Sequence, residues 1–123
     1  MAYTATVTVT REGADTIIHI SEVDCAAGDE ATCPGVPSTG TVLRQTCVLT
    51  AGTATSVNPA LTTTPGGTGA AVVVSNLTPG ATIDHATPHV AFRGGAGTLY
   101  HQSTPDAGAD NSVTTVYLIR AGW

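Results

Sequence analysis

Strict alternation between threonine and small apolar residues at the start of the chain constrains its fold more than any other feature. The threonines take the even positions from Thr4 to Thr10, and apolar side chains take the odd positions from Tyr3 to Val9. A period of two residues is typical of a half-buried antiparallel strand. Thr, Val and Ile make up 41 of the 123 residues, and such β-branched side chains favour strands over helices. We therefore expect a fold built from β-strands.

Similar patterns follow at intervals of about 8 to 12 residues, separated by turns rich in Gly and Pro. We expect further strands over residues 16–21, 41–50, 53–57, 70–75, 81–84, 89–93, 98–103 and 112–120. The turn composition of residues 12–15 predicts that the first two strands form a hairpin. The pattern predicts an all-β fold, an antiparallel β-sandwich or small barrel of about seven to nine strands with no long helix. We expect one domain over residues 1–123, with a long loop at about 21–40.

Alternation assigns the residues of two expected strands to their faces. In residues 41–50, one face holds Leu43, Gln45, Cys47 and Leu49, and the other holds Val42, Arg44, Thr46 and Val48. In the last strand, Val113, Thr115, Tyr117 and Ile119 lie opposite Val116 and Leu118. The last strand is therefore expected to be apolar on both faces.

Charge and hydropathy exclude two classes of partner. The chain has a net charge of −5, with four Arg and no Lys, and such a composition has no basic patch for a phosphate backbone, so we expect no nucleic-acid partner. No apolar run reaches the roughly 18 residues that a membrane span needs. Met1 leads directly into the first strand pattern without the features of a secretory signal, so we expect synthesis in the cytoplasm, unless Met1 was added to a processed form.

The three cysteines fall into two groups. Cys25 and Cys33 lie in the expected loop and are a candidate disulfide, because a folded-back loop can bring them within bonding distance. The alternative is a pair of reduced loop thiols. Cys47 is expected to be a small buried side chain on its strand. None of the three shows the paired spacing of a zinc site.

The histidines offer the main enzymatic alternative. His85, His89 and His101 are candidate metal ligands, but Pro88 and an extended backbone would keep the first two apart unless the chain bends. A surface or strand-edge histidine with a hydrogen-bond partner is the favoured interpretation. The sequence contains no nucleophile elbow and no phosphate-binding loop, so we expect neither catalysis nor a cofactor.

Charge poverty is the most informative anomaly in the composition. Only 11% of the residues are charged, against about 25% in ordinary domains. A surface of Thr, Ser, Ala and Gly loses little on burial, which favours permanent assembly with other proteins. A GC-rich genome would produce the same composition, so this alternative stays open.

The chain as a whole resembles the decoration or cement proteins of tailed-bacteriophage virions, which are small Thr/Ala/Gly-rich β-sandwiches on capsids. The resemblance lies in general character: a start without an export signal, a strand at each end, low charge and Gly/Pro turns. It implies a non-enzymatic virion protein that oligomerises, often as a trimer, and bridges subunits of the major capsid protein or binds another virion protein. Tyr3 and Trp123, in the terminal segments, are then interface candidates, although Trp123 could equally cap its own sandwich.

Two other functions remain open at this stage. One is a tail-associated or surface carbohydrate-binding module, which would need two of Tyr3, Phe92, Tyr100 and Trp123 in one groove. The other is a small metal-dependent enzyme, which would need the three histidines to converge.

Overall fold

A computed structural model of the protein describes residues 3–26, 28–63, 71–74, 84–86, 90–92, 97–108 and 110–121. These residues form ten strands and no helix. The strands are β1 (Thr4–Glu12), β2 (Asp15–Cys25), β3 (Glu30–Pro34), β4 (Gly40–Ala51), β5 (Val57–Thr62), β6 (Ala71–Val74), β7 (Asp84–Ala86), β8 (Val90–Phe92), β9 (Thr98–Pro105) and β10 (Asn111–Ala121). In the part of the chain described, no helix is long and apolar enough to cross a membrane.

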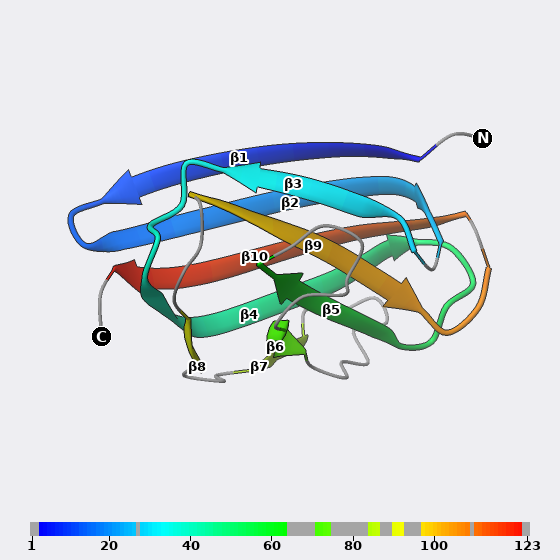
Figure 1. Ribbon diagram of the computed structural model, residues 1–123. Helices are drawn as coiled ribbons and strands as arrows, with labels where there is room; N and C mark the ends of the chain where they lie inside the picture. The colour runs from blue at the N-terminus through cyan, green and yellow to red at the C-terminus, as the bar shows by residue number, and fades with distance from the viewer. Residues whose placement is uncertain are drawn as a thin grey trace.

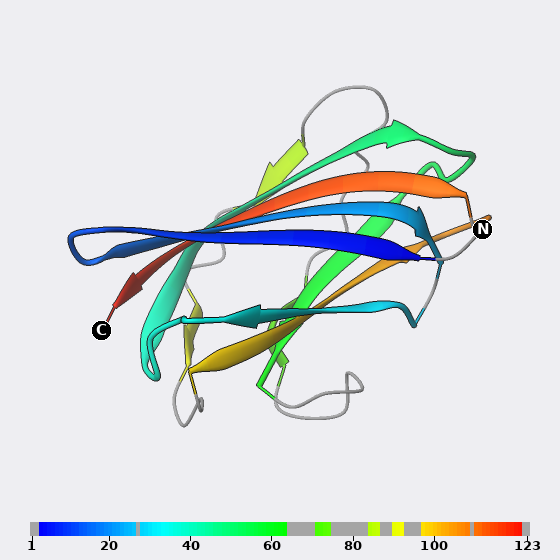
Figure 2. The same cartoon turned by 90° about the horizontal axis from the view of Figure 1, so that it is seen from above.

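The strands form two antiparallel sheets that pack face to face. Sheet A has six strands in the order β1-β2-β10-β4-β7, with β8 also paired to β4, and sheet B has four in the order β3-β9-β5-β6. Figure 1 looks onto the sheets, and Figure 2, from above, separates β1 and β2 from β3 and β9. The predicted all-β antiparallel sandwich is confirmed, with seven strands of five or more residues and three shorter ones.

The predicted first hairpin is present and has a tight turn. Glu12 pairs with Asp15, so only Gly13 and Ala14 lie between the strands. Gly13 has a φ of 62°, a left-handed value that glycine adopts without strain, and a glycine at this first position is typical of a type II′ turn. The pairing continues without a break from this turn to Thr4 and Val23.

Alternating side chains of the central strands fill the space between the sheets. Sheet A contributes Ile18 and Ile20 from β2 and Tyr117 and Ile119 from β10, all with no exposed surface. The main core cluster also contains Val36, from the segment between β3 and β4, and residues of the other strands, namely Ala31, Cys33, Val42, Leu61, Phe92 and Leu99. The predicted faces of β10 are confirmed: Val113, Thr115, Tyr117 and Ile119 point inward, whereas the apolar side chains of Val116 and Leu118 are half-buried on the outside.

The prediction of the two faces of β4 is wrong near the N-terminal end of the strand, where there is a β-bulge. Leu118 pairs with Arg44, but its neighbour Ile119 pairs with Val42, so Leu43 is the extra residue. An extra residue reverses the alternation beyond it. Val42 is therefore buried with Gln45, whereas the sequence pattern placed it on the face of Arg44.

The prediction of a long loop at about 21–40 is also wrong. Residues 21–25 continue β2, and Glu30–Pro34 form β3, which pairs with β9. The Gly and Pro residues mark the ends of this strand rather than a loop throughout, since Pro34 is its last residue and Gly35 has a φ of 75°. Similarly, the strand expected at 53–57 begins at Val57 and runs to Thr62.

Core substitutions on β2 should separate its two faces. Ile18→Ala should lower the free energy of unfolding by about 2–5 kcal/mol, because it leaves a cavity between the sheets. Ile17→Ala, on the half-buried outer face of the same strand, should cost about 1 kcal/mol or less. Urea unfolding of both variants measures the difference, and equal losses would contradict the observed register.

Candidate functional site

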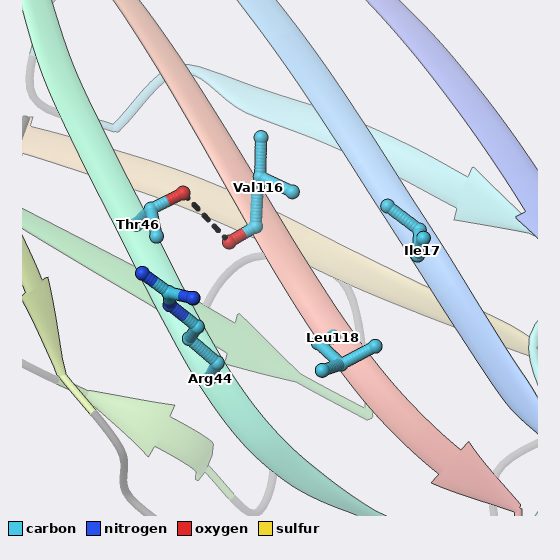
Figure 3. A pocket seen from close by; sticks show the side chains of 5 residues that line it. All are labelled: Ile17, Arg44, Thr46, Val116 and Leu118. Carbon is cyan, nitrogen blue, oxygen red and sulfur yellow. Dashed lines mark hydrogen bonds between the residues drawn. The ribbon is translucent and has the colours of Figure 1, made fainter.

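The outer face of sheet A carries a shallow groove. Five side chains line it, Ile17 from β2, Arg44 and Thr46 from β4, and Val116 and Leu118 from β10, and the groove has a volume of about 350 Å³. Figure 3 shows these side chains projecting from three adjacent strands on the same side of the sheet. We call this site the outer groove.

The strand register places the lining residues in rows across the sheet. Leu118 lies between Ile17 on one side and Arg44 on the other, and Val116 lies beside Thr46. The Thr46 hydroxyl donates to the backbone oxygen of Val116 at 3.5 Å, as the dashed line in Figure 3 marks. The groove is therefore mainly aliphatic, with the Arg44 guanidinium at one side.

Among the side chains that the structure describes, Arg44 supplies the only charge that lines the outer groove. Its side chain is exposed, and among the described residues no carboxylate lies within ion-pair distance of it. The other arginine on this face, Arg120, pairs with Asp15 at 3.1 Å. An anionic group on a binding partner would therefore find Arg44 uncompensated.

A second group of polar residues lies inside the sandwich. Glu22 from β2 accepts from Ser103 at 2.7 Å and contacts Nε2 of His101 at 2.9 Å. Nδ1 of His101 lies 2.7 Å from the Tyr117 hydroxyl, and Tyr3 donates to the second oxygen of Glu22 at 2.6 Å. We call these residues and Gln45 the buried polar cluster.

Links within this cluster cross from one sheet to the other. Glu22 and Tyr117 belong to sheet A, whereas His101 and Ser103 belong to sheet B. Gln45 from β4 adds another link, because its Nε2 donates to the backbone oxygen of Pro59 on β5 at 2.9 Å. Its Oε1 has no hydrogen-bond partner among the described residues. The cluster thus joins the two layers by directional bonds.

Burial and hydrogen bonding act in opposite directions on the Glu22 carboxyl. Burial raises its pKa, but hydrogen bonds from His101, Tyr3 and Ser103 and the attraction to His101 outweigh burial, and the pKa lies below its usual value. Burial raises the pKa of the Tyr117 hydroxyl well above its usual value. Glu22 is therefore the anionic member of the cluster at neutral pH.

Glu22, His101 and Ser103 have the residue types of a catalytic triad but not its geometry. In a triad the acid and the nucleophile bind opposite nitrogens of the imidazole. Here both Glu22 and Ser103 contact Nε2, while Nδ1 faces Tyr117. His101 and Ser103 are fully enclosed, so a substrate cannot reach them. The arrangement is that of a structural cluster.

The candidate disulfide between Cys25 and Cys33 is not formed, and both are free buried thiols, as in the reduced alternative, but they lie in strands rather than in a loop. Sγ of Cys25 lies 3.6 Å from the backbone oxygen of Ser103 on β9. Cys33 on β3 pairs instead with Leu99, which precedes Ser103 on β9 by four residues. Four residues of a strand span about 13 Å, so β3 carries Cys33 away from Cys25. Burial raises the pKa of Cys33 to about 12 and also raises the pKa of Cys25, which keeps both thiols protonated. Cys47 is buried as predicted.

The three histidines considered as candidate metal ligands do not form a described site. His101 is buried in sheet B, and this corrects the expectation of a surface or strand-edge histidine. The backbone of His85 lies in β7, opposite Thr46 in sheet A, and His89 lies outside the described residues. Over the described ranges, no group of three His, Cys, Asp or Glu could hold a metal ion.

The two interface candidates have different outcomes. Tyr3 is half-buried and bonds to Glu22 of its own chain. Trp123 lies outside the described residues. Tyr3 is therefore part of the internal network.

Sequence reasoning missed Glu22, although a signal was available. Glu22 follows Ile18 and Ile20 at intervals of two residues, which predicts the same inward face. Its burial with His101 depends on β9 lying opposite β2, and no sequence spacing shows this. The sequence predicted part of the outer groove, because alternation placed Val116 and Leu118 together on one apolar face of the last strand.

The similarity of the chain to known proteins is distant. No protein-family model matches the chain, and no curated protein matches it. A solved structure described as "CBM4 structure and function" has a TM-score of 0.42 and 13% identity, covering 94% of this chain and 89% of that one. The "Schizosaccharomyces pombe Cnp3 Cupin Domain" has a TM-score of 0.31 and 12% identity over 98% of this chain, which spans only 61% of that one.

Removal of the buried carboxylate should be strongly destabilising. Glu22→Ala should lower the free energy of unfolding by about 3–5 kcal/mol, because His101, Ser103 and Tyr3 lose their shared partner inside the sandwich. Glu12→Ala, at an exposed position of the first hairpin, is the control and should change it by about 0.5 kcal/mol or less. Urea unfolding measures both, and a small loss for Glu22→Ala would show that the cluster does not hold the sheets together.

The lowered pKa of Glu22 also predicts a direction of pH dependence. Because the unfolded chain binds this proton more readily, the stabilisation is present at neutral pH and is lost as the pH falls below about 4.5. The difference in free energy of unfolding between wild type and Glu22→Gln should therefore shrink from about pH 6 to about pH 3. A difference that stays constant or grows would mean that Glu22 is not ionised in the fold.

Proposed function

We propose that the protein is a non-enzymatic assembly protein that docks onto a larger protein shell through the outer face of sheet A. The observation that carries this proposal is the outer groove, an aliphatic surface on the outside of a sheet with the Arg44 guanidinium, which pairs with no described carboxylate. The sequence resemblance to decoration proteins favours a virion shell, built from a major capsid protein, as the partner.

The surroundings of the groove support docking against protein. Four exposed threonines, from Thr4 to Thr10 in β1, lie on the same face, since their pairing partners in β2 alternate with the buried residues. Val23, also on this face, is 43% exposed. Neutral side chains of this kind lose few water contacts on burial, so a partner surface can cover them at little desolvation cost.

The buried polar cluster supports a non-enzymatic function. Its carboxylate, imidazole and hydroxyl groups are those that acid–base catalysis would use, and they bond to one another inside the sandwich. The described residues that line the outer groove include no carboxylate, imidazole or thiol.

The aromatic residues do not favour the carbohydrate-binding alternative. Tyr117 and Phe92 are buried in the core, and the Tyr3 hydroxyl is bonded to Glu22. Tyr100 is half-buried on β9 of sheet B, and no aromatic side chain lines the outer groove. Sugar rings stack on exposed aromatic faces, so the described residues offer no such platform.

Virion composition and rebinding test the proposal. We expect mass spectrometry to find the chain in many copies in purified virions of the virus that encodes it. Arg44→Glu and Leu118→Asp should each weaken binding of the purified protein to shells that lack it by about tenfold or more, because each places a carboxylate in the covered groove. Co-sedimentation with the shells measures the bound fraction.

A substitution on the other sheet provides the matched control. Thr104→Glu, exposed on β9 of sheet B, should bind like the wild type. Arg44 is exposed, so Arg44→Glu keeps the interior intact, and circular dichroism checks the fold of each variant. Absence from virions, or equal binding of all three variants, would refute the proposal.

A further inference from the structure

Strand β1 is the one long edge strand of the described sheets. The others are short or end in proline: β6 has four residues, β7 has three, and β3 has five and ends at Pro34. β1 has nine residues, contains neither Pro nor Lys, and carries no charge from Thr4 to Thr10. Figure 1 shows it along the border of sheet A. Proteins commonly interrupt or charge such edges to prevent pairing with other chains, and the part of β1 from Thr4 to Thr10 has neither protection, because the two charged residues, Arg11 and Glu12, lie at its end.

The tight hairpin determines which backbone groups of β1 face outward. Glu12 and Asp15 flank the turn and form the first hydrogen-bonded pair, so the even residues of β1 bond to β2. The N–H and C=O groups of Ala5, Val7 and Val9 therefore point away from β2. Among the described strands, β2 is the only one paired with β1.

The sequence of β1 matches itself in the antiparallel direction. From Thr4 to Thr10 it is nearly the same in both directions, with Val7 at the centre. An antiparallel pair centred on Val7 sets Thr6 opposite Thr8 and Ala5 opposite Val9. This register brings together the backbone groups that point outward, and it pairs threonines with threonines, a favourable cross-strand combination without like charges.

We propose that two copies of this chain pair through β1, antiparallel and centred on Val7, to form a symmetric dimer with one continuous sheet. The symmetry is two-fold, because the same edge serves both copies. This assigns a dimer in place of the trimer that the sequence resemblance implies.

The size of the contact makes the dimer reversible. A nine-residue strand is about 30 Å long, and a single pair of edges buries less than the roughly 1,200 Å² of a stable interface. Side chains opposite each other in an antiparallel pair point to the same side, so both outer grooves share one face. If the proposed docking holds, the dimer engages a repetitive shell through two grooves at once.

Charge substitutions at two exposed positions test the pairing and its register. In Thr6→Lys/Thr8→Lys, each Lys lies opposite a Lys of the second copy, whereas in Thr6→Lys/Thr8→Glu each Lys lies opposite a Glu. Both positions are exposed, so neither pair of substitutions disturbs the core. Sedimentation equilibrium from micromolar to millimolar chain should show a dimer for wild type, association weakened about tenfold or more for the first variant, and full association for the second.

Cysteine cross-linking provides an independent readout. Under mild oxidation, a mixture of Thr6→Cys and Thr8→Cys chains should form a disulfide-linked dimer. Either variant alone should not, because like positions lie diagonally, about 7–8 Å apart. The native cysteines, Cys25, Cys33 and Cys47, are buried and should not compete.

Three outcomes would overturn the dimer: a wild-type chain that stays monomeric at millimolar concentration, equal association of the two charge variants, or cross-linking of each cysteine variant alone as fast as the mixture. This test is separate from the proposed function. A dimer that binds no shell would remove the docking proposal alone, and a monomer that binds shells would remove the dimer alone.

Discussion

The hydrogen-bonded pair of Glu22 and His101 is the interaction on which the packing of the two sheets depends. Glu22 belongs to sheet A and His101 to sheet B, and both are enclosed. An ionised carboxylate in an apolar interior is costly unless donors surround it, and here His101, Ser103 and Tyr3 do so. Apolar contacts are not directional, whereas these bonds are, so they determine how β9 lies against β2.

The buried polar cluster thus lies between the sheets, whereas the aliphatic side chains of the outer groove lie on the outside of sheet A. The groups that could transfer protons are used to join the sheets, while Ile17, Val116 and Leu118 remain on the outer face. Charged side chains are also absent from Thr4 to Thr10 of β1, so this edge of sheet A is open to another strand.

Local patterns predicted the elements whose structure depends on neighbours in sequence. The turn at Gly13, the first hairpin and the two faces of β10 follow from alternation and turn composition alone. The prediction failed at Val42, because the bulge at Leu43 arises from the pairing of β4 with β10. It also failed between residues 21 and 40, where pairing with β9 makes a strand from a segment rich in turn residues.

The sequence by itself determined the all-β class, the inward face of β2 and the neutral character of the exterior, because each follows from a period of two residues or from composition. Only the tertiary structure decided that Cys25 and Cys33 stay apart, that His101 meets Glu22, and that Ile17, Arg44 and Leu118 line one groove. These are contacts between strands distant in the chain. Strand order and register set such contacts, and they depend on how the whole interior packs rather than on any local segment.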